Sequence, residues 1–118
     1  MDYVDGFVVP VPKKKLAAYK KLARLAAKVW KDHGALDYKE CLADDVSWGK
    51  RTSFPRSVKL KKTEVVIFSY ITYKNRKDRD RIMKAVMSDK RFDGMDPKKM
   101  PFDAKRMIFG GFKTIVEI

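Results

Sequence analysis

Residues 100–112 read MPFDAKRMIFGGF, and this stretch is the most informative part of the chain for the fold. A turn that contains a proline, a carboxylate and two cations leads into an aromatic strand with two adjacent glycines. Glycine weakens a strand interior, so Gly110 and Gly111 indicate a bulge or a place where another group approaches the backbone closely. We therefore expect a final strand over residues 105–117 that carries such a feature at its centre.

Three more strands are predicted upstream of this stretch. Residues 64–74 give the clearest pattern, because most of their side chains are β-branched or aromatic. Residues 3–11 carry apolar side chains on both faces, which predicts a strand that is covered on both sides. Residues 35–43 place Leu36, Tyr38 and Leu42 on one side and form the remaining strand.

Two helices are predicted between these strands. Residues 13–33 form the first, since apolar side chains recur there at spacings of three and four, and Gly34 ends it as a C-terminal cap. Asn75 caps the second helix, whose apolar stripe consists of Ile82, Met83, Val86 and Met87. Residues 44–62 are expected to form a long polar loop, and a short helical turn is expected at Asp96-Pro97.

The order β-α-β-β-α-β predicts an α+β fold, a ferredoxin-like sandwich in which two helices cover one face of a four-stranded antiparallel sheet. The whole chain, residues 1–118, is expected to be a single domain. Because the strands are apolar on both faces, the sheet would expose an apolar surface in a monomer. We therefore expect a homodimer in which two sheets pack face to face as a dimeric α/β barrel.

Composition excludes several classes of protein. The chain has one cysteine, Cys41, so no internal disulfide and no cysteine-based zinc site is expected. No signal peptide and no membrane span is evident, which favours a cytoplasmic protein. The formal net charge of +13 meets the electrostatic criterion for nucleic-acid binding, but a solvated basic surface is the favoured explanation.

Several stretches together resemble the YbaA-like bacterial proteins, a family of unknown function: YVDGF at residues 3–7, HGAL at 33–36, TSF at 52–54, MPFD at 100–103 and KRMIFGGF at 105–112. The resemblance covers nearly the whole chain. It implies a ferredoxin-like chain of the dimeric α/β barrel superfamily, which includes cofactor-independent monooxygenases, haem-binding enzymes and ligand-binding modules. Fold does not transfer function, so no reaction follows from it.

Three residues are catalytic candidates. Asp5 lies within an apolar strand, where a carboxylate is costly unless paired; we expect Lys105 or Arg106 of the last strand as its partner. Asp5 is either a structural carboxylate or a general base in a pocket, with Arg106 beside it. His33 is either an ordinary residue at the end of the first helix or a general base or axial haem ligand, as in some superfamily members.

The ligand-binding candidates surround the glycines. Missing side chains at Gly6, Gly110 and Gly111 on neighbouring strands would open a hollow rimmed by Phe7, Tyr70, Phe109 and Phe112. A bulge packed against the dimer partner is the alternative. Trp48 and Phe54 on the long loop either close this hollow or anchor the loop at an interface.

These features favour a dimer that binds an unidentified small molecule, with oxygenase-like activity as an enzymatic form of that function. No metal or cofactor is assigned. A basic RNA-binding protein is the alternative, but residues 65–70 lack the signature of an RNA-recognition domain, so nucleic acid is not favoured. A structural dimer module without catalysis is the third hypothesis.

Overall fold

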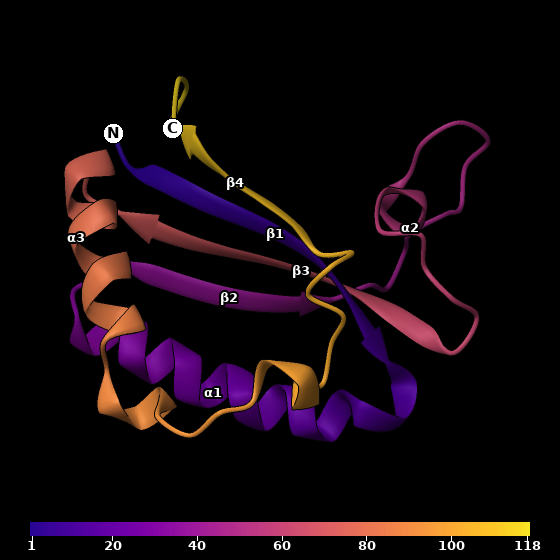
Figure 1. The fold of residues 1–118 in the computed structure, drawn as a ribbon. Coiled ribbons are helices and arrows are strands. Elements are labelled where there is room, and N and C mark those ends of the chain that lie inside the picture. Colours follow the sequence, from indigo (N-terminus) through magenta and orange to yellow (C-terminus); the bar gives the residue numbers. More distant parts are fainter.

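The computed structural model describes residues 1–118 and shows a four-stranded sheet with two long helices on one face (Figure 1). The strands are β1 (Tyr3–Pro12), β2 (Asp37–Leu42), β3 (Glu64–Tyr73) and β4 (Ile108–Lys113), and the α-helices are α1 (Leu16–Asp32), α2 (Phe54–Ser57) and α3 (Arg76–Met87). Short 3₁₀ helices are η1 (Lys13–Lys15), η2 (Lys90–Phe92) and η3 (Pro97–Lys99). No helix combines the length and apolar character that crossing a membrane requires.

The sheet order is β2-β3-β1-β4, and each neighbouring pair is antiparallel. Both crossover connections contain a helix, and α1 and α3 lie on the same side of the sheet (Figure 1). This arrangement confirms the predicted ferredoxin-like fold with a four-stranded antiparallel sheet.

The core lies between the sheet and the helices. One buried cluster joins β1 and β3 to the C-terminal half of α1 and to α3, and consists of Tyr3, Val29, Ile71, Tyr73, Ile82 and Val86. A second cluster joins the other ends of the same strands to the start of α1, and consists of Val9, Val11, Tyr19 and Ile67. Burial of these side chains holds the two layers together.

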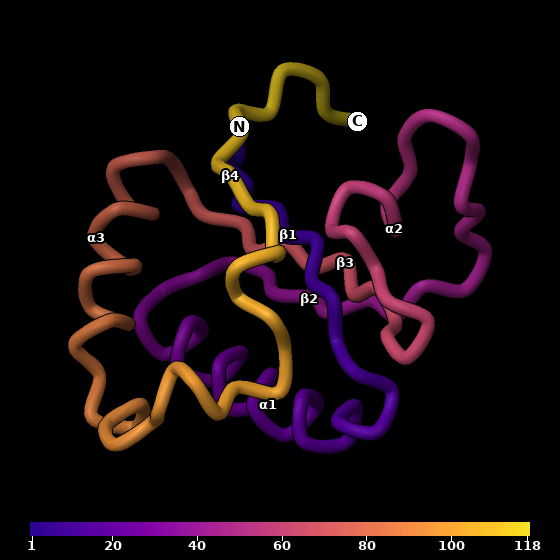
Figure 2. The backbone as a smooth tube through the Cα atoms, turned by 45° about the vertical axis from the view of Figure 1, so that its right-hand side comes forward, coloured from indigo at the N-terminus to yellow at the C-terminus, as the bar shows by residue number.

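The long loop covers part of the opposite face. Its helix α2 was not predicted; the Ser53 side chain caps it by accepting a hydrogen bond from the Arg56 backbone N–H, at 3.1 Å. The loop then buries Val58 against Val8 and Val66, on the face that points away from α1. Figure 2 shows this loop on the far side of the sheet from α1. The expectation that β1 is covered on both faces is therefore met only at this end, because Val4 and Gly6 remain partly exposed.

Local signals in the sequence form as predicted at several boundaries. The Asn75 side chain accepts a hydrogen bond from the Asp78 backbone N–H at 2.7 Å and caps α3. Gly34 has a φ of 112° just after α1, a conformation that favours glycine. Asp96 caps η3 by accepting from the Lys98 N–H at 2.9 Å.

The last strand is shorter than predicted, since β4 starts at Ile108 and ends at Lys113. Before it, the Met107 N–H donates to the Asp103 carbonyl at 3.2 Å, so residues 103–107 form a turn. After it, β1 offers no further residues to pair with, because Lys113 already faces Tyr3 at the start of β1. The chain then turns away from the sheet (Figure 2).

Candidate functional site

Asp5 is buried on the helix side of β1, and its partner is Arg79 of α3. The Arg79 Nε donates to the Asp5 carboxylate at 3.1 Å, and its guanidinium lies over the Tyr3 ring, 5.0 Å from the ring centroid. The predicted pairing with Lys105 or Arg106 is therefore wrong. Asp5 faces Gly111 on β4, whereas Lys105 and Arg106 come before this strand begins.

Gly111 makes room for this ion pair. A Cβ atom at Gly111 would collide with the Arg79 guanidinium and the Tyr3 side chain. The second glycine of the pair therefore serves the close packing of Asp5, Arg79 and Tyr3 on the helix side.

Arg106 lies elsewhere, as a clamp between three segments. It donates to Glu64 at 2.8 and 2.5 Å, to Asp103 at 2.8 Å, and to the carbonyl oxygens of Val58 and Lys59. These hydrogen bonds hold the pKa of Glu64 below its usual value. The guanidinium thus ties the start of β3 to the loop and to the turn before β4.

His33 ends α1 and lies 2.7 Å from the Asp89 carboxylate, in a group that ties α1 to the segment after α3. Arg91 donates to Asp89 and to Asp32 in the same group. Hydrogen bonds from Arg91, and then from His33, hold the pKa of Asp89 well below its usual range. The three catalytic candidates therefore lie in three separate networks.

The ligand-binding candidates mostly come together. Six of the seven line a hollow of about 500 Å³ on the open face of the sheet: Gly6, Phe7, Tyr70, Phe109, Gly110 and Phe112. We call this the sheet-face hollow. Gly6 and Gly110 are cross-strand partners, and the Phe112 ring lies 3.6–3.7 Å from where their Cβ atoms would be. Phe112 thus occupies the space that the two missing side chains leave.

A second concave site, which the sequence patterns did not predict, lies between the sheet and the helices. This helix-side cavity has a volume of about 420 Å³, and sixteen of its eighteen lining residues are hydrophobic. The sheet, α1, α3 and the segment after α3 all contribute walls, and none of the eighteen is Lys, Arg or His. Its size and apolar lining are typical of a small-molecule site.

Small and flexible side chains create this cavity. Ala23 and Ala26 lie on the α1 wall, where larger residues would fill the space. Four methionines also line it, from α3 and the following segments: Met87, Met95, Met100 and Met107. Methionine adapts its shape readily and is common at binding surfaces that accept varied ligands.

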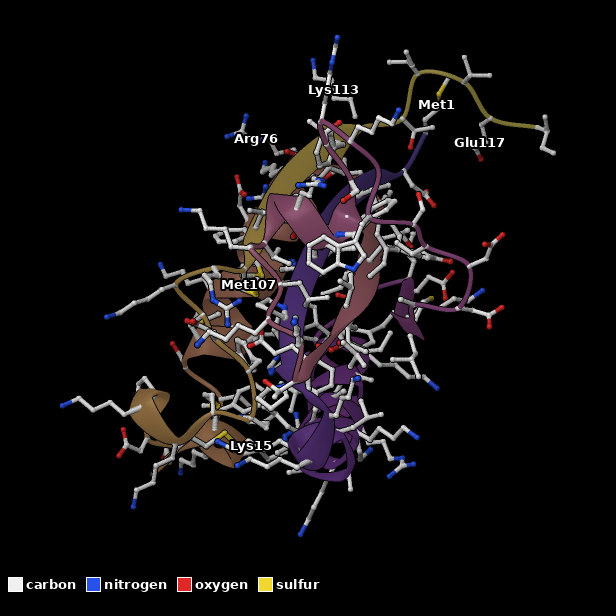
Figure 3. All side chains as sticks on the ribbon, turned by 90° about the vertical axis from the view of Figure 1, so that its right-hand side faces the viewer. Met1, Lys15, Arg76, Met107, Lys113 and Glu117 are labelled. Carbon is white, nitrogen blue, oxygen red and sulfur yellow. The ribbon has the colours of Figure 1, made fainter.

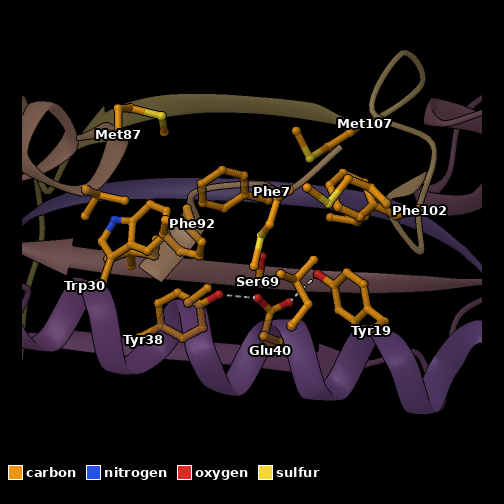
Figure 4. A pocket seen from close by; sticks show the side chains of 18 residues that line it. Phe7, Tyr19, Trp30, Tyr38, Glu40, Ser69, Met87, Phe92, Phe102 and Met107 are labelled. Carbon is orange, nitrogen blue, oxygen red and sulfur yellow. Dashed lines mark hydrogen bonds between the residues drawn. The ribbon is translucent and has the colours of Figure 1, made fainter. Parts of the chain in front are cut away.

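Glu40 is the polar centre of the helix-side cavity. Tyr19 of α1 donates to Glu40 Oε1 and Tyr38 of β2 donates to Oε2, each at 2.7 Å (Figure 4). Burial raises the pKa of both tyrosine hydroxyls, and the charge of Glu40 raises it further. Ser69 of β3 contributes one more hydroxyl group to the wall. The hydroxyl donors orient the carboxylate between the aromatic ends of the cavity.

One signal in the sequence pointed to this site. Glu40 alternates with Tyr38 and Leu42 on the face of β2 that was predicted to be apolar. A carboxylate in such a position needs partners. Its donors lie on two different elements, one of them twenty-one residues away, so the spacing within the strand did not reveal them.

The fold and its two concave surfaces define a small ferredoxin-like protein with a ligand-sized cavity beneath its helices. The sequence matches the family described as "Protein of unknown function (DUF1428)" over residues 2–104, and the chain belongs to this family. It is 47% identical over 117 residues to the uncharacterized protein YbaA of Escherichia coli strain K12, covering 99% of both chains, and it matches the YbaA protein of Shigella flexneri to the same extent. The predicted family resemblance is therefore confirmed.

A solved structure shows the same fold. The crystal structure of a dimeric ferredoxin-like protein from an uncultured marine organism matches the full length of both chains, with a TM-score of 0.59 and 12% sequence identity. At this identity the similarity concerns the fold alone.

Proposed function

We propose that this protein binds a small, mostly apolar molecule in the helix-side cavity. The observation that carries the proposal is a ligand-sized apolar volume with one oriented carboxylate, Glu40, in its wall. Binding sites commonly combine such a lining with few polar groups that fix the ligand's orientation.

The test is binding of N-phenyl-1-naphthylamine, a neutral probe whose fluorescence rises in apolar surroundings. Ala26→Leu would fill the cavity from α1, while Ala18→Leu, on the exposed side of the same helix, is the matched control. We expect saturable binding that Ala26→Leu weakens at least about tenfold and Ala18→Leu leaves unchanged. Equal binding by both variants would exclude the helix-side cavity as the site.

In the enzymatic version of this proposal, the bound molecule is the substrate of an oxygenase-like reaction. Glu40 is the carboxylate in the cavity, so it is the candidate general base there. Consumption of dissolved oxygen in the presence of a bound ligand, lost in Glu40→Gln, would support it. Binding without turnover by the wild-type protein would leave the protein a ligand-binding module.

We also propose that the open face of the sheet forms a homodimer interface, with two sheets packed as in a dimeric α/β barrel. Ile108 and Phe112 of the edge strand expose 45% and 62% of their surface on this face. The structural neighbour described above is dimeric, which supports a second copy of this chain as the occupant. In such a dimer the sheet-face hollow belongs to the interface, and Phe112 packs against the partner.

A nucleic-acid-binding function is the weaker candidate. The Lys13 N–H donates to the Thr63 carbonyl at 2.9 Å, and this contact brings the two lysine runs of the sequence together around a shallow hollow that Lys13, Lys14 and Lys62 line. Elsewhere the basic side chains extend outward on all sides of the molecule (Figure 3), rather than forming one groove. Arg79, Arg91 and Arg106 are engaged with carboxylates.

Salt dependence separates the two functions. Affinity for RNA or DNA that falls by orders of magnitude between 50 and 200 mM salt would favour the nucleic-acid hypothesis. Binding of the neutral probe should be insensitive to the same change. If no small molecule raises the melting temperature and no nucleic acid binds, the structural dimer module remains.

A further inference from the structure

The polar groups of the helix-side cavity present mainly hydrogen-bond acceptors. The Tyr19 and Tyr38 hydroxyl protons are both directed to Glu40, and the Trp30 indole N–H donates to the Tyr73 hydroxyl at 3.1 Å. The two carboxylate oxygens and the two tyrosine oxygens keep lone pairs that can accept further bonds. A polar ligand group that enters this cavity therefore meets acceptors, and only the Ser69 hydroxyl is left to donate.

The charge on the cavity wall also favours a ligand group that donates hydrogen bonds, and in particular a cationic one. Glu40 accepts from two neutral hydroxyl groups, and no lysine, arginine or histidine lines the walls. A carboxylate in apolar surroundings is stabilised by a hydrogen-bonded cation. Since the lining provides none, the ligand is the natural source. An anionic ligand would instead meet a like charge close to apolar walls.

Aromatic rings close one end of the cavity beside Glu40. The Trp30 ring centroid lies 6.0 Å from that of Tyr38 and 6.3 Å from that of Phe92, with all three side chains on the cavity wall (Figure 4). Ring faces attract organic cations, most strongly where water is excluded. An ammonium group at Glu40 would therefore lie close to aromatic rings as well as to a carboxylate.

We propose that the ligand of the helix-side cavity is an apolar molecule that carries a protonated amine, with the ammonium group hydrogen-bonded to Glu40 and the apolar body among the methionines and aromatic rings. The proposal rests on the proposed function, because it identifies the class of molecule that the same cavity binds.

The experiment compares three probes that share one aromatic body: 2-(naphthalen-2-yl)ethanamine, 2-(naphthalen-2-yl)ethanol and naphthalen-2-ylacetate. Binding to the wild-type protein is measured by calorimetry at 150 mM salt, where long-range repulsion between the amine and the basic surface is largely screened. We expect the amine to bind at least about tenfold more tightly than the alcohol, and the acid most weakly.

Two variants then test whether Glu40 causes the tighter binding of the amine. Glu40→Gln keeps the shape of the side chain and removes its charge, and should reduce the ratio of amine to alcohol affinity to below about threefold. Glu117→Gln makes the same change of net charge on the exposed C-terminal tail and should leave the ratio as in the wild type. A ratio that survives in Glu40→Gln would overturn the assignment of the ammonium group to Glu40.

The result on the wild-type protein is decisive even if Glu40→Gln fails to fold. Binding of the alcohol or the acid at least as tight as that of the amine, and weakened by Ala26→Leu, would overturn this inference and leave the proposed function intact. Absence of binding by all three probes and by N-phenyl-1-naphthylamine would overturn both.

Discussion

The side chains on the two faces of the sheet have different surroundings. On the helix side, Asp5 and Glu40 each find donors on other elements of the chain, and the packing leaves one apolar cavity around Glu40. On the open face, Ile108 and Phe112 stay largely exposed beside a hollow with hardly any polar groups. The contrast is the reason why we propose small-molecule binding for the helix side and association with a second copy for the open face.

The largest effect on stability is expected where a buried carboxylate loses its partner. Arg106→Met should lower the free energy of unfolding by about 3–5 kcal/mol, because Glu64, whose side chain is 5% exposed, would be left without its cation. Lys105→Met, at the exposed neighbouring position, is the matched control and should change little. Denaturant unfolding of both variants measures the difference, and equal stabilities would show that the clamp contributes nothing.

The pH dependence of stability gives a second readout of the same pair. The folded state holds the pKa of Glu64 below its ordinary value of 4.5 through hydrogen bonds from Arg106. Glu64 therefore stabilises the fold above pH 4.5, and this contribution is lost as the pH falls through its folded pKa. The wild-type protein should lose more stability between pH 6 and pH 3 than Arg106→Met does. Parallel losses in the two proteins would contradict the assignment.

Sequence patterns predicted the structural features that depend only on residues close together in the chain. The β-branched run of β3, the Asn75 cap and the Asp96 turn each need only a few adjacent positions. The partner of Asp5 lies seventy-four residues away on the most polar stretch of α3, where Arg79 looks like an ordinary surface cation. The end of β4 is set by where β1 begins, whereas the β-branched residues Thr114, Ile115 and Val116 after it suggested a longer strand.

The helix-side cavity was unpredictable for a related reason. A strand or helix pattern shows which side chains point inward, but a cavity depends on how much volume several elements together leave unfilled. Ala26 on α1 reads as one more apolar residue of the stripe. It becomes a cavity wall because residues of separate segments, Met87 and Met107 among them, line the same space without filling it.

The next largest effect concerns the open face. Phe112→Lys should weaken dimer formation at least about a hundredfold, because two lysines would be buried near an apolar interface. Light scattering at tens of micromolar should then report a monomer for this variant and a dimer for the wild type. Ala18→Lys adds the same charge on α1 and should remain dimeric. A monomeric wild-type protein would rule out the interface itself.

The two adjacent glycines allow a finer comparison of the faces, since consecutive strand residues point to opposite sides. Gly111→Ala should destabilise the protein by about 1–3 kcal/mol, because its Cβ would collide with Arg79 and Tyr3 and disturb the contacts of Arg79 with Asp5 and Tyr3. Thermal unfolding of the variant and of the wild type at the same protein concentration provides the measurement. A stability equal to that of the wild type would mean that the Asp5 group tolerates rearrangement.

Gly110→Ala should have the smallest effect, below about 0.5 kcal/mol. Its Cβ would lie 3.6 Å from the Phe112 ring, an ordinary contact, and Gly110 does not have the positive φ that would strain an alanine. Alanine also restricts the unfolded chain, which offsets any small loss of packing. The same substitution one residue apart thus separates a face packed around an ion pair from a face with room beside an aromatic ring. If Gly110→Ala destabilises as much as Gly111→Ala, Phe112 is held rigidly in place. A partner subunit that packs on the ring would have this effect, so the measurement is best repeated at a protein concentration where light scattering reports a monomer.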